Sequence, residues 1–376
     1  MLIKFYCSTK TLQILFYLCP SMQKKLHILA APLDWGLGHA TRMIPLLRYL
    51  SEQKHHLMMG VNSLTSAFLK AQLPHAKFYD IPSYNIEYSA SASSLSLAKL
   101  IPKMIKAKKA ENNWVKEFVE NMQVDLIISD SRFGFYHSSI PSVIITHQLT
   151  LQFPMGYSFL GRIAQAVNEK WLKQFDQIWV PDSKDHYLSG NLSINKKLNA
   201  HFIGHQSRLK LQNKPNPIGK EYILCILSGP EPQRTKLEEL IMKQSSSVKE
   251  QVIIIGGKPQ EDKVQYDLEN TIYFNHLQDD EMAAFIQNAS FIISRSGYSS
   301  IMDYYALGCK HLFLIPTPGQ TEQIYLAKRL KEKGICDFEY QDAFDLAKLI
   351  ESKNILSGFD IKSSSISEFE DLILNI

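Results

Sequence analysis

The chain has 376 residues, of which 45% are hydrophobic and 21% are charged, and a formal net charge of +4. This length suits two domains of ordinary size, and the composition excludes a disordered protein. A net charge this small gives no argument for nucleic acid as a partner. The five cysteines are odd in number and scattered without metal-ligand spacing. They support neither a disulfide framework nor a zinc site, so a cytoplasmic location is the simplest account.

Residues 1–21 are expected to be an N-terminal extension of uncertain status. Their apolar run, 12–19, is far too short to span a bilayer as a helix, and no signal-peptide cleavage site is clear. Met22 follows closely and leads into the first expected strand. We therefore expect Met22 to be the biological start, and a membrane-touching extension is the alternative.

Apolar runs alternate with helical patterns in both halves of the chain, which predicts parallel sheets covered on both faces. The first half has expected strands at 26–31, 56–61, 126–129, 142–146 and 177–180. Its expected helices are 41–53, 63–71, 95–122, with a break considered at Pro102, and 161–174. The second half has expected strands at 222–227, 251–255, 271–274, 291–294 and 311–315.

The predicted fold class is α/β, with two Rossmann-like domains facing each other across a cleft. The polar stretch 206–220 contains two prolines and is interpreted as a linker. The domain boundaries that follow are 22–205 for the first domain and 221–376 for the second.

The loop after the first expected strand contains Gly36, Gly38 and His39. Two glycines permit a tight turn and a close approach of the backbone to a ligand. A dinucleotide fingerprint needs a third glycine or alanine where Thr41 stands, and it needs an acidic residue where the second strand runs into Asn62. An NAD site is therefore excluded.

Three more polar side chains of the first half are expected at this edge of its sheet. Arg42 faces the cleft or pairs with Asp34, and both alternatives stay open. Asp130 ends an apolar strand, and it is interpreted as a base, as a partner that orients His39, or as a turn-forming cap. His147 ends the next strand, where a structural imidazole is the common alternative to a functional one.

The second half offers two loops for a phosphorylated ligand. The first follows strand 222–227 and contains the candidates Ser228, Gly229 and Arg234, with a plain proline-rich turn as the alternative. The second lies in the segment 291–327, where a strand passes into a helix at Ser294, Arg295, Ser296 and Gly297. Free N–H groups at a helix start favour anions, so a phosphate or diphosphate is the expected ligand.

The rest of this segment adds groups that suit a nucleotide-sugar. Asp303 lies almost two turns into the helix, and a polar loop contains Gly319, Gln320, Glu322 and Gln323. An ordinary βαβ unit with a polar rim is the alternative.

The segment 291–327 resembles the donor-binding region of MurG-like glycosyltransferases of the GT-B type, which carry a glycosyltransferase family 28 C-terminal domain. The turn matches at Ser294, Arg295 and Gly297, and the loop matches at Glu322 and Gln323, where the family more often has two glutamines. Asp303 replaces the family's usual glutamate, which shortens its reach toward the ribose by one methylene. The motif Gly36-x-Gly38-His39-x-x-Arg42 resembles the N-terminal loop of the same family, and also that of hydrolases of nucleotide-linked sugars.

The resemblance implies a GT-B fold whose last helix, within 367–376, packs back on the first domain. It implies transfer of a sugar, N-acetylglucosamine from UDP-N-acetylglucosamine, to a glycan or lipid-linked acceptor, with inversion. It places His39 at the reaction centre as the candidate base, and helix capping or phosphate orientation is the alternative role. We expect no cofactor other than the UDP-sugar co-substrate, and no metal. A nucleotide-sugar hydrolase or epimerase, or a non-catalytic binding protein, is the alternative function.

Residues 94–118 form a basic amphipathic stretch in which lysines alternate with apolar side chains. Such a pattern can lie on an anionic membrane surface, and a solvated face over core residues is the alternative. The expected location is the cytoplasm, and the inner face of the cytoplasmic membrane is left open.

Overall fold

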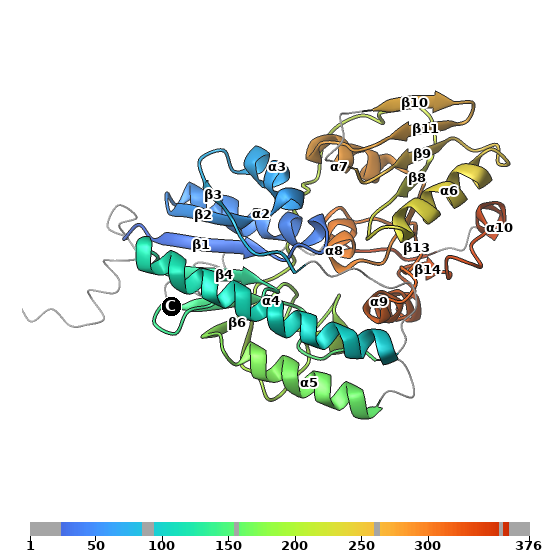
Figure 1. The fold of residues 1–376 in the computed structure, drawn as a ribbon. Helices are drawn as coiled ribbons and strands as arrows, with labels where there is room; N and C mark the ends of the chain where they lie inside the picture. The colour runs from blue at the N-terminus through green and yellow to red at the C-terminus, as the bar shows by residue number, and fades with distance from the viewer. Residues whose placement is uncertain (1–23, 85–93, 154–157, 259–263, 353–355, 361–376) are drawn as a thin grey trace, which may run out of the picture.

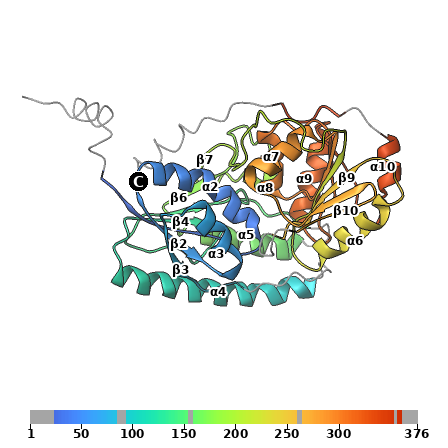
Figure 2. The ribbon, with the colours of Figure 1, turned by 90° about the horizontal axis from the view of Figure 1, so that it is seen from above.

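A computed structural model describes residues 24–84, 94–153, 158–258, 264–352 and 356–360. The expected extension 1–21 and the expected last helix within 367–376 lie outside these residues. The chain forms two α/β halves that lie against each other (Figures 1 and 2).

The first half contains a seven-stranded sheet in the order β3-β2-β1-β4-β5-β6-β7, and all of its pairings are parallel. Its strands are β1 (His27–Pro32), β2 (His56–Val61), β3 (Lys77–Asp80), β4 (Leu126–Asp130), β5 (Ser142–Ile145), β6 (Gln177–Val180) and β7 (Ala200–Phe202). Its helices are α2 (Leu37–Glu52), α3 (Ser63–Gln72), α4 (Ser94–Asn121) and α5 (Ser158–Leu172), with a 3₁₀ turn at Gly190–Ser193.

The second half contains a seven-stranded sheet in the order β10-β11-β9-β8-β12-β13-β14, with an antiparallel edge strand, β10. Its strands are β8 (Ile223–Ile226), β9 (Val252–Ile255), β10 (Gln265–Leu268), β11 (Thr271–Phe274), β12 (Phe291–Ser294), β13 (Leu312–Leu314) and β14 (Asp337–Phe338). Its helices are α6 (Gln233–Ser245), α7 (Asp279–Asn288), α8 (Tyr298–Ala306), α9 (Thr321–Glu332) and α10 (Leu346–Ser352).

Alternate residues of each central strand face opposite layers of helices. In the first half, Ile28 packs with α2 and α3, whereas its neighbour Leu29 packs with α4. In the second half, Leu224 packs with α7, α8 and α9, whereas Cys225 packs with α6 and α10. Burial on both faces explains why these strands are continuous apolar runs. The predicted α/β class with two covered parallel sheets is confirmed.

Two predictions about elements were wrong. The break considered at Pro102 is absent, because α4 runs through this residue. Pro102 is exposed, so water can satisfy the carbonyl group that loses its backbone partner. The second error is that β3, β7, β10 and β14 were not predicted. They are the four edge strands of the two sheets, and their side chains are only partly buried or exposed.

The expected linker, 206–220, lies between β7, which ends at Phe202, and β8, which begins at Ile223. Both sheets reverse their strand order at a central pair, β1 and β4 in the first and β8 and β12 in the second. Ligands of open parallel sheets bind at the carboxyl ends of such pairs. A ligand site is therefore expected among the loops that follow these four strands.

Candidate functional site

His39 and Asp130 form a pair at the carboxyl edge of the first sheet. His39 lies in the first turn of α2, Asp130 ends β4, and His39 Nδ1 lies 2.8 Å from Asp130 Oδ1. The Asp130 side chain is fully buried, whereas 22% of the His39 side chain is exposed. Burial and the charge of Arg42 lower the pKa of His39, although Asp130 opposes this shift. The imidazole is therefore neutral near pH 7.

Arg42 lies one turn after His39 and pairs with Asp130 rather than with Asp34. Its Nε donates to Asp130 Oδ2 at 2.6 Å, and its Nη2 donates to Asp130 Oδ1. Burial alone would raise the pKa of Asp130, but the charge of Arg42 and the hydrogen bonds from Arg42 and His39 hold it at about 2. Asp34 instead accepts hydrogen bonds from Asn62 and from Ser83. The pairing favours orientation of His39 over proton transfer as the role of Asp130.

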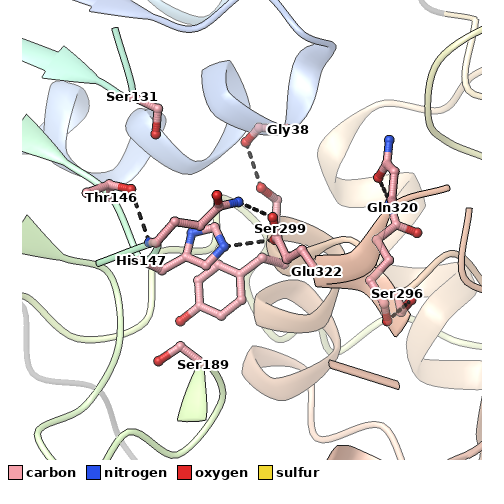
Figure 3. Close-up of polar contacts among 12 residues, drawn as sticks. Gly38, Ser131, Thr146, His147, Ser189, Ser296, Ser299, Gln320 and Glu322 are labelled. Carbon is pink, nitrogen blue, oxygen red and sulfur yellow. Dashed lines mark hydrogen bonds and ion pairs between the residues drawn. The ribbon is translucent and has the colours of Figure 1, made fainter. Parts of the chain in front are cut away.

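His147 and Glu322 connect the two halves of the chain (Figure 3). His147 follows β5 in the first half, Glu322 lies in the first turn of α9 in the second, and His147 Nε2 lies 2.8 Å from Glu322 Oε1. Gln148 Nε2 donates to the other oxygen, Glu322 Oε2. Burial alone would raise the pKa of Glu322, but the hydrogen bond from His147 and the charge of Arg42 lower it. The predicted sugar-side carboxylate thus faces the predicted first-domain histidine.

The start of α8 also contacts the first half. The ring of Tyr298 stacks on His147 with centroids 3.9 Å apart, and its hydroxyl donates to the Pro181 carbonyl at 2.8 Å. Ser299 Oγ donates to the Gly38 carbonyl at 2.8 Å (Figure 3). Gly36 precedes α2 with φ of 112°, a conformation that favours glycine. The two glycine-containing loops therefore meet where α2 and α8 begin.

The turn before α8 has buried side chains, and no side chain caps the N-terminus of the helix. Ser294 Oγ accepts from the Tyr304 hydroxyl, and Ser296 Oγ donates to a carbonyl of α9. Arg295 is fully buried, and its guanidinium donates to the Gln233 carbonyl at 2.7 Å. Burial lowers the pKa of Arg295 to about 10. Gly297 caps α8 without a side-chain hydrogen bond, so the first amides of this helix are open to an anion.

The loop before α9 is held by Gln323. Its side-chain Oε1 accepts from the Thr317 amide at 2.9 Å, and its Nε2 donates to Gln320 Oε1 at 2.6 Å. Gly319 makes the turn between them with φ of 84°. The hydroxyl group of Thr317, in this loop, is buried and has no hydrogen-bond partner among the described residues. It is therefore available to a bound ligand.

Asp303 lies on α8 and accepts a hydrogen bond from Ser207 of the connecting segment. Burial raises the pKa of Asp303 to about 6, although Arg208 and Ser207 oppose the shift. A carboxyl group that titrates near neutrality is a candidate for ligand binding.

The loop after β8 and the start of α6 contain the three remaining candidates for binding the donor diphosphate. Ser228 and Gly229 follow the strand, and Gly229 has φ of 102°. Arg234 lies in the first turn of α6, and its guanidinium contacts Glu231 at 2.6 Å and also Glu238. Two carboxylates already balance this cation, so a diphosphate would have to compete with them. The donor roles of Ser228, Gly229, Arg234 and Arg295 remain predictions.

The structure therefore brings five predicted residues together at the junction of the two halves: His39, Arg42, Asp130, His147 and Glu322. Gln148 and Tyr298 were missed as site residues. Gln148 directly follows His147, and this adjacency was the available signal. Nothing in the sequence indicates that the ring of Tyr298 packs on the other half of the chain. In the described part of the chain, no group of three or more acidic, histidine or cysteine side chains could hold a metal ion.

Comparisons with known proteins address the class of the protein. Residues 223–356 match the family described as "Glycosyltransferase family 28 C-terminal domain". No curated protein sequence gives a significant match. Among solved structures, the calicheamicin glycosyltransferase CalG4 is similar, with a TM-score of 0.60 at 15% identity over 89% of this chain and 90% of that one.

Two further similar structures contain nucleotides. The spinosyn rhamnosyltransferase SpnG complexed with thymidine diphosphate has a TM-score of 0.58 at 12% identity, over 93% of this chain and 91% of that one. UGT89C1 of Arabidopsis thaliana, complexed with UDP-L-rhamnose, has a TM-score of 0.57 at 15% identity, over 94% and 99% of the two chains.

The two facing Rossmann-like halves and the family match define a glycosyltransferase of GT-B fold. The match to the glycosyltransferase family 28 C-terminal domain lies wholly in the second half of the chain. The predicted type, fold and enzyme class are confirmed at this level, and the MurG-like specificity remains a prediction.

Proposed function

We propose that the protein transfers N-acetylglucosamine from UDP-N-acetylglucosamine to the hydroxyl group of a glycan or lipid-linked acceptor, with inversion. The pair of His39 and Asp130, which lies at the junction of the two halves together with Glu322, carries this proposal. The nucleotides in SpnG and UGT89C1 support a nucleotide-sugar donor. The choice of UDP and of N-acetylglucosamine rests on the resemblance of the segment 291–327 to MurG-like enzymes.

The proposed base is His39. Its lowered pKa keeps the imidazole neutral, and Asp130 holds Nδ1, so Nε2 is left to accept a proton. The acceptor oxygen forms a bond to the anomeric carbon while the bond from that carbon to the diphosphate breaks. The proton of the acceptor hydroxyl passes to His39 Nε2, and the nucleoside diphosphate leaves with the bonding electron pair.

The proposed donor site stabilises the leaving group with the free amides at the start of α8, where a helix dipole favours negative charge. Asp303 would bind the ribose hydroxyls, and Glu322 and Gln323 would bind the sugar. Thr317 Oγ1 is available to hydrogen-bond the ligand, because it is buried and has no partner among the described residues. No step of this scheme requires a metal.

Hydrolysis is the alternative that the same residues support, because water can replace the acceptor hydroxyl beside His39. Non-catalytic binding is the second alternative. Purified protein incubated with UDP-N-acetylglucosamine alone should release UDP slowly if it is a transferase without its acceptor, and rapidly if it is a hydrolase. If no nucleotide or nucleotide-sugar raises the melting temperature, the proposed donor site is wrong.

The proposed base is tested by the His39→Ala variant. A positioned general base contributes about 10²- to 10⁴-fold to rate, so turnover should fall by this factor while the affinity for UDP is retained. His75→Ala is the matched control, because His75 is exposed between α3 and β3 and lies outside the site. Full turnover in His39→Ala would remove His39 as the base.

A membrane contact is the proposed route to a lipid-linked acceptor. In α4, Lys103, Ile105 and Lys106 are exposed, and the exposed fraction of Phe159 in α5 is 72%. Both helices cover the same face of the first sheet (Figure 1). Basic and apolar side chains on one face suit an anionic lipid surface. Within the described residues, no helix is long and apolar enough to cross a membrane.

A further inference from the structure

The guanidinium group of Arg42 contacts four side chains of the first half at once. It donates twice to Asp130, its Nη2 lies 3.1 Å from Ser131 Oγ and 2.9 Å from His39 Nδ1, and its Nη1 lies 3.3 Å from His147 Nδ1. Only 2% of its side chain is exposed. An arginine carries five N–H groups in a fixed fork and accepts no hydrogen bond. Its contacts therefore constrain which ring nitrogens around it carry protons.

The two hydrogens of Nη2 determine the tautomer of His39. They face three possible acceptors: Asp130 Oδ1, Ser131 Oγ at 3.1 Å and His39 Nδ1 at 2.9 Å. His39 Nδ1 cannot accept from Arg42 while it donates to Asp130, and a charged carboxylate is the stronger partner, so we assign both Nη2 hydrogens to the two oxygens. Asp130 is ionised and can only accept, so the hydrogen bond of 2.8 Å between it and Nδ1 requires a proton on Nδ1. Nε2 of His39 is then unprotonated, and it has no hydrogen-bond partner among the described residues.

His147 has the opposite arrangement. Its Nδ1 faces an N–H group of Arg42 at 3.3 Å, and because arginine can only donate, this nitrogen is the acceptor. Its Nε2 faces Glu322 Oε1 at 2.8 Å, and because the carboxylate can only accept, this nitrogen carries the proton. The ring is therefore neutral with its proton on Nε2, pointed at the carboxylate of the second half.

We propose that Arg42 is a positioning residue that holds His39 and His147 in opposite tautomers, one presenting an empty Nε2 for a proton and the other presenting Nε2–H to Glu322. This inference rests on the proposed function, because it assigns His39 as the base. It adds that one buried side chain links the base to the predicted sugar-side carboxylate through His147.

The charged groups around His39 set the pH below which it is lost as a base. His39 faces Asp130 from β4, Arg42 from its own helix, His147 from the loop after β5, and Glu322 from α9. Asp130 favours a protonated ring and Arg42 disfavours it. Removing the positive charge of Arg42 leaves the negative charge of Asp130 unopposed, which raises the pKa of His39. The ring then stays protonated up to a higher pH and cannot act as a base below it.

The test uses the full chain with ¹⁵N-labelled histidine, and it reads the imidazole nitrogens by long-range ¹H–¹⁵N correlation. His39→Gln and His147→Gln assign the two rings. The wild-type protein should show Nδ1–H in His39 and Nε2–H in His147. The same tautomer in both rings would overturn the proposal, and this reading needs neither an acceptor nor activity.

Two variants separate the charge of Arg42 from its shape. Arg42→Lys keeps the charge but cannot reach all four partners, so both tautomers should become mixed and kcat should fall roughly 10- to 100-fold with donor KM nearly unchanged. Arg42→Gln removes the charge, so the acid limb of the pH–rate profile should move up by on the order of 1 unit. Arg48→Lys, on the same helix and outside the cluster, is the matched control.

These experiments test the positioning role of Arg42 separately from the proposed sugar transfer. Fixed wild-type tautomers that persist in Arg42→Lys would refute the positioning role, whatever the enzyme does. The predicted tautomers without any sugar transfer would refute the proposed function and leave the positioning role standing. If Arg42→Gln does not fold, the wild-type tautomers and Arg42→Lys still decide the matter.

Discussion

Replacing Asp303 with asparagine should make the protein more stable at neutral pH while weakening nucleotide binding. The carboxyl group is held on α8 beside Ser207, and burial raises its pKa from 3.8 to about 6. The folded protein therefore holds this proton more tightly than the unfolded chain does. The stability that the protonated group contributes is fully present below pH 3.8, and it is lost as the pH rises through about 6.

The magnitude follows from the size of this shift. One pKa unit corresponds to about 1.4 kcal/mol, so a shift of roughly 2 units costs the folded state about 3 kcal/mol above pH 6. Asparagine does not ionise and can still accept the hydrogen bond from Ser207. Asp303→Asn should therefore raise the melting temperature at pH 8 by up to about 6–12 °C, at about 2–4 °C per kcal/mol for domains of this size.

The assay is thermal unfolding of both proteins at several pH values between 5 and 8. The advantage of Asp303→Asn should shrink as the pH falls toward 5, because the wild-type carboxyl group then regains its proton. Asp280→Asn is the control, since Asp280 is exposed in the first turn of α7. An advantage that is the same at every pH, or absent at pH 8, would refute the argument that burial of a charge is the cause.

The same variant tests the proposed contact with ribose. A hydrogen bond to a charged group is worth about 1.5–3 kcal/mol, so UDP should bind Asp303→Asn roughly 10- to 100-fold more weakly at pH 8. Calorimetric titration with UDP measures this, and the gain in stability shows in the same sample that the variant is folded. Unchanged affinity would exclude Asp303 from the nucleotide site.

Three other changes test the contacts between the halves and the proposed membrane face. Tyr298→Phe keeps the ring but removes the hydrogen bond to the Pro181 carbonyl, which should cost about 1–3 kcal/mol and lower the melting temperature. Gly190→Ala strains a residue with φ of 56° and places a methyl group 2.5 Å from side chains of α9, so a loss of about 2–5 kcal/mol is expected by thermal unfolding. Reversing the charge of Lys103 and Lys106 with glutamate should reduce cosedimentation with anionic vesicles by at least about 10-fold, since each basic residue contributes about 1 kcal/mol.

Each of these predictions has a control or an outcome that contradicts it. Gly219→Ala has the same backbone strain but no atom within 4 Å of the added methyl group, so it should cost less than Gly190→Ala. Lys328→Glu combined with Lys348→Glu, on exposed positions of the second half, should leave vesicle binding unchanged. Equal losses in the two glycine variants, or equal vesicle binding in the two lysine variants, would contradict the predictions. An unchanged melting temperature in Tyr298→Phe would contradict the predicted role of its hydrogen bond to Pro181.

The central strands of both sheets could be predicted because each is an apolar run that helices cover on both faces. β1, β4, β8 and β12 are of this kind, and so the two-sheet organisation follows from the sequence. The four edge strands have two to four residues with partly exposed side chains, and they leave no such run. They form because a neighbouring strand offers backbone partners, which is a property of the folded sheet.

The positions of the polar loops can be predicted from the sequence alone, since each loop follows an apolar strand and precedes a helix. This pattern identified His39, Asp130, His147 and Glu322 as candidates. The tertiary structure decided their partners, because the pairs are separated by tens to hundreds of residues: Asp130 lies 88 residues from Arg42, and Glu322 lies 175 residues from His147. The first pair depends on the strand order that makes β4 the neighbour of β1, and the second depends on how the two halves pack. Local sequence patterns carry no information about either.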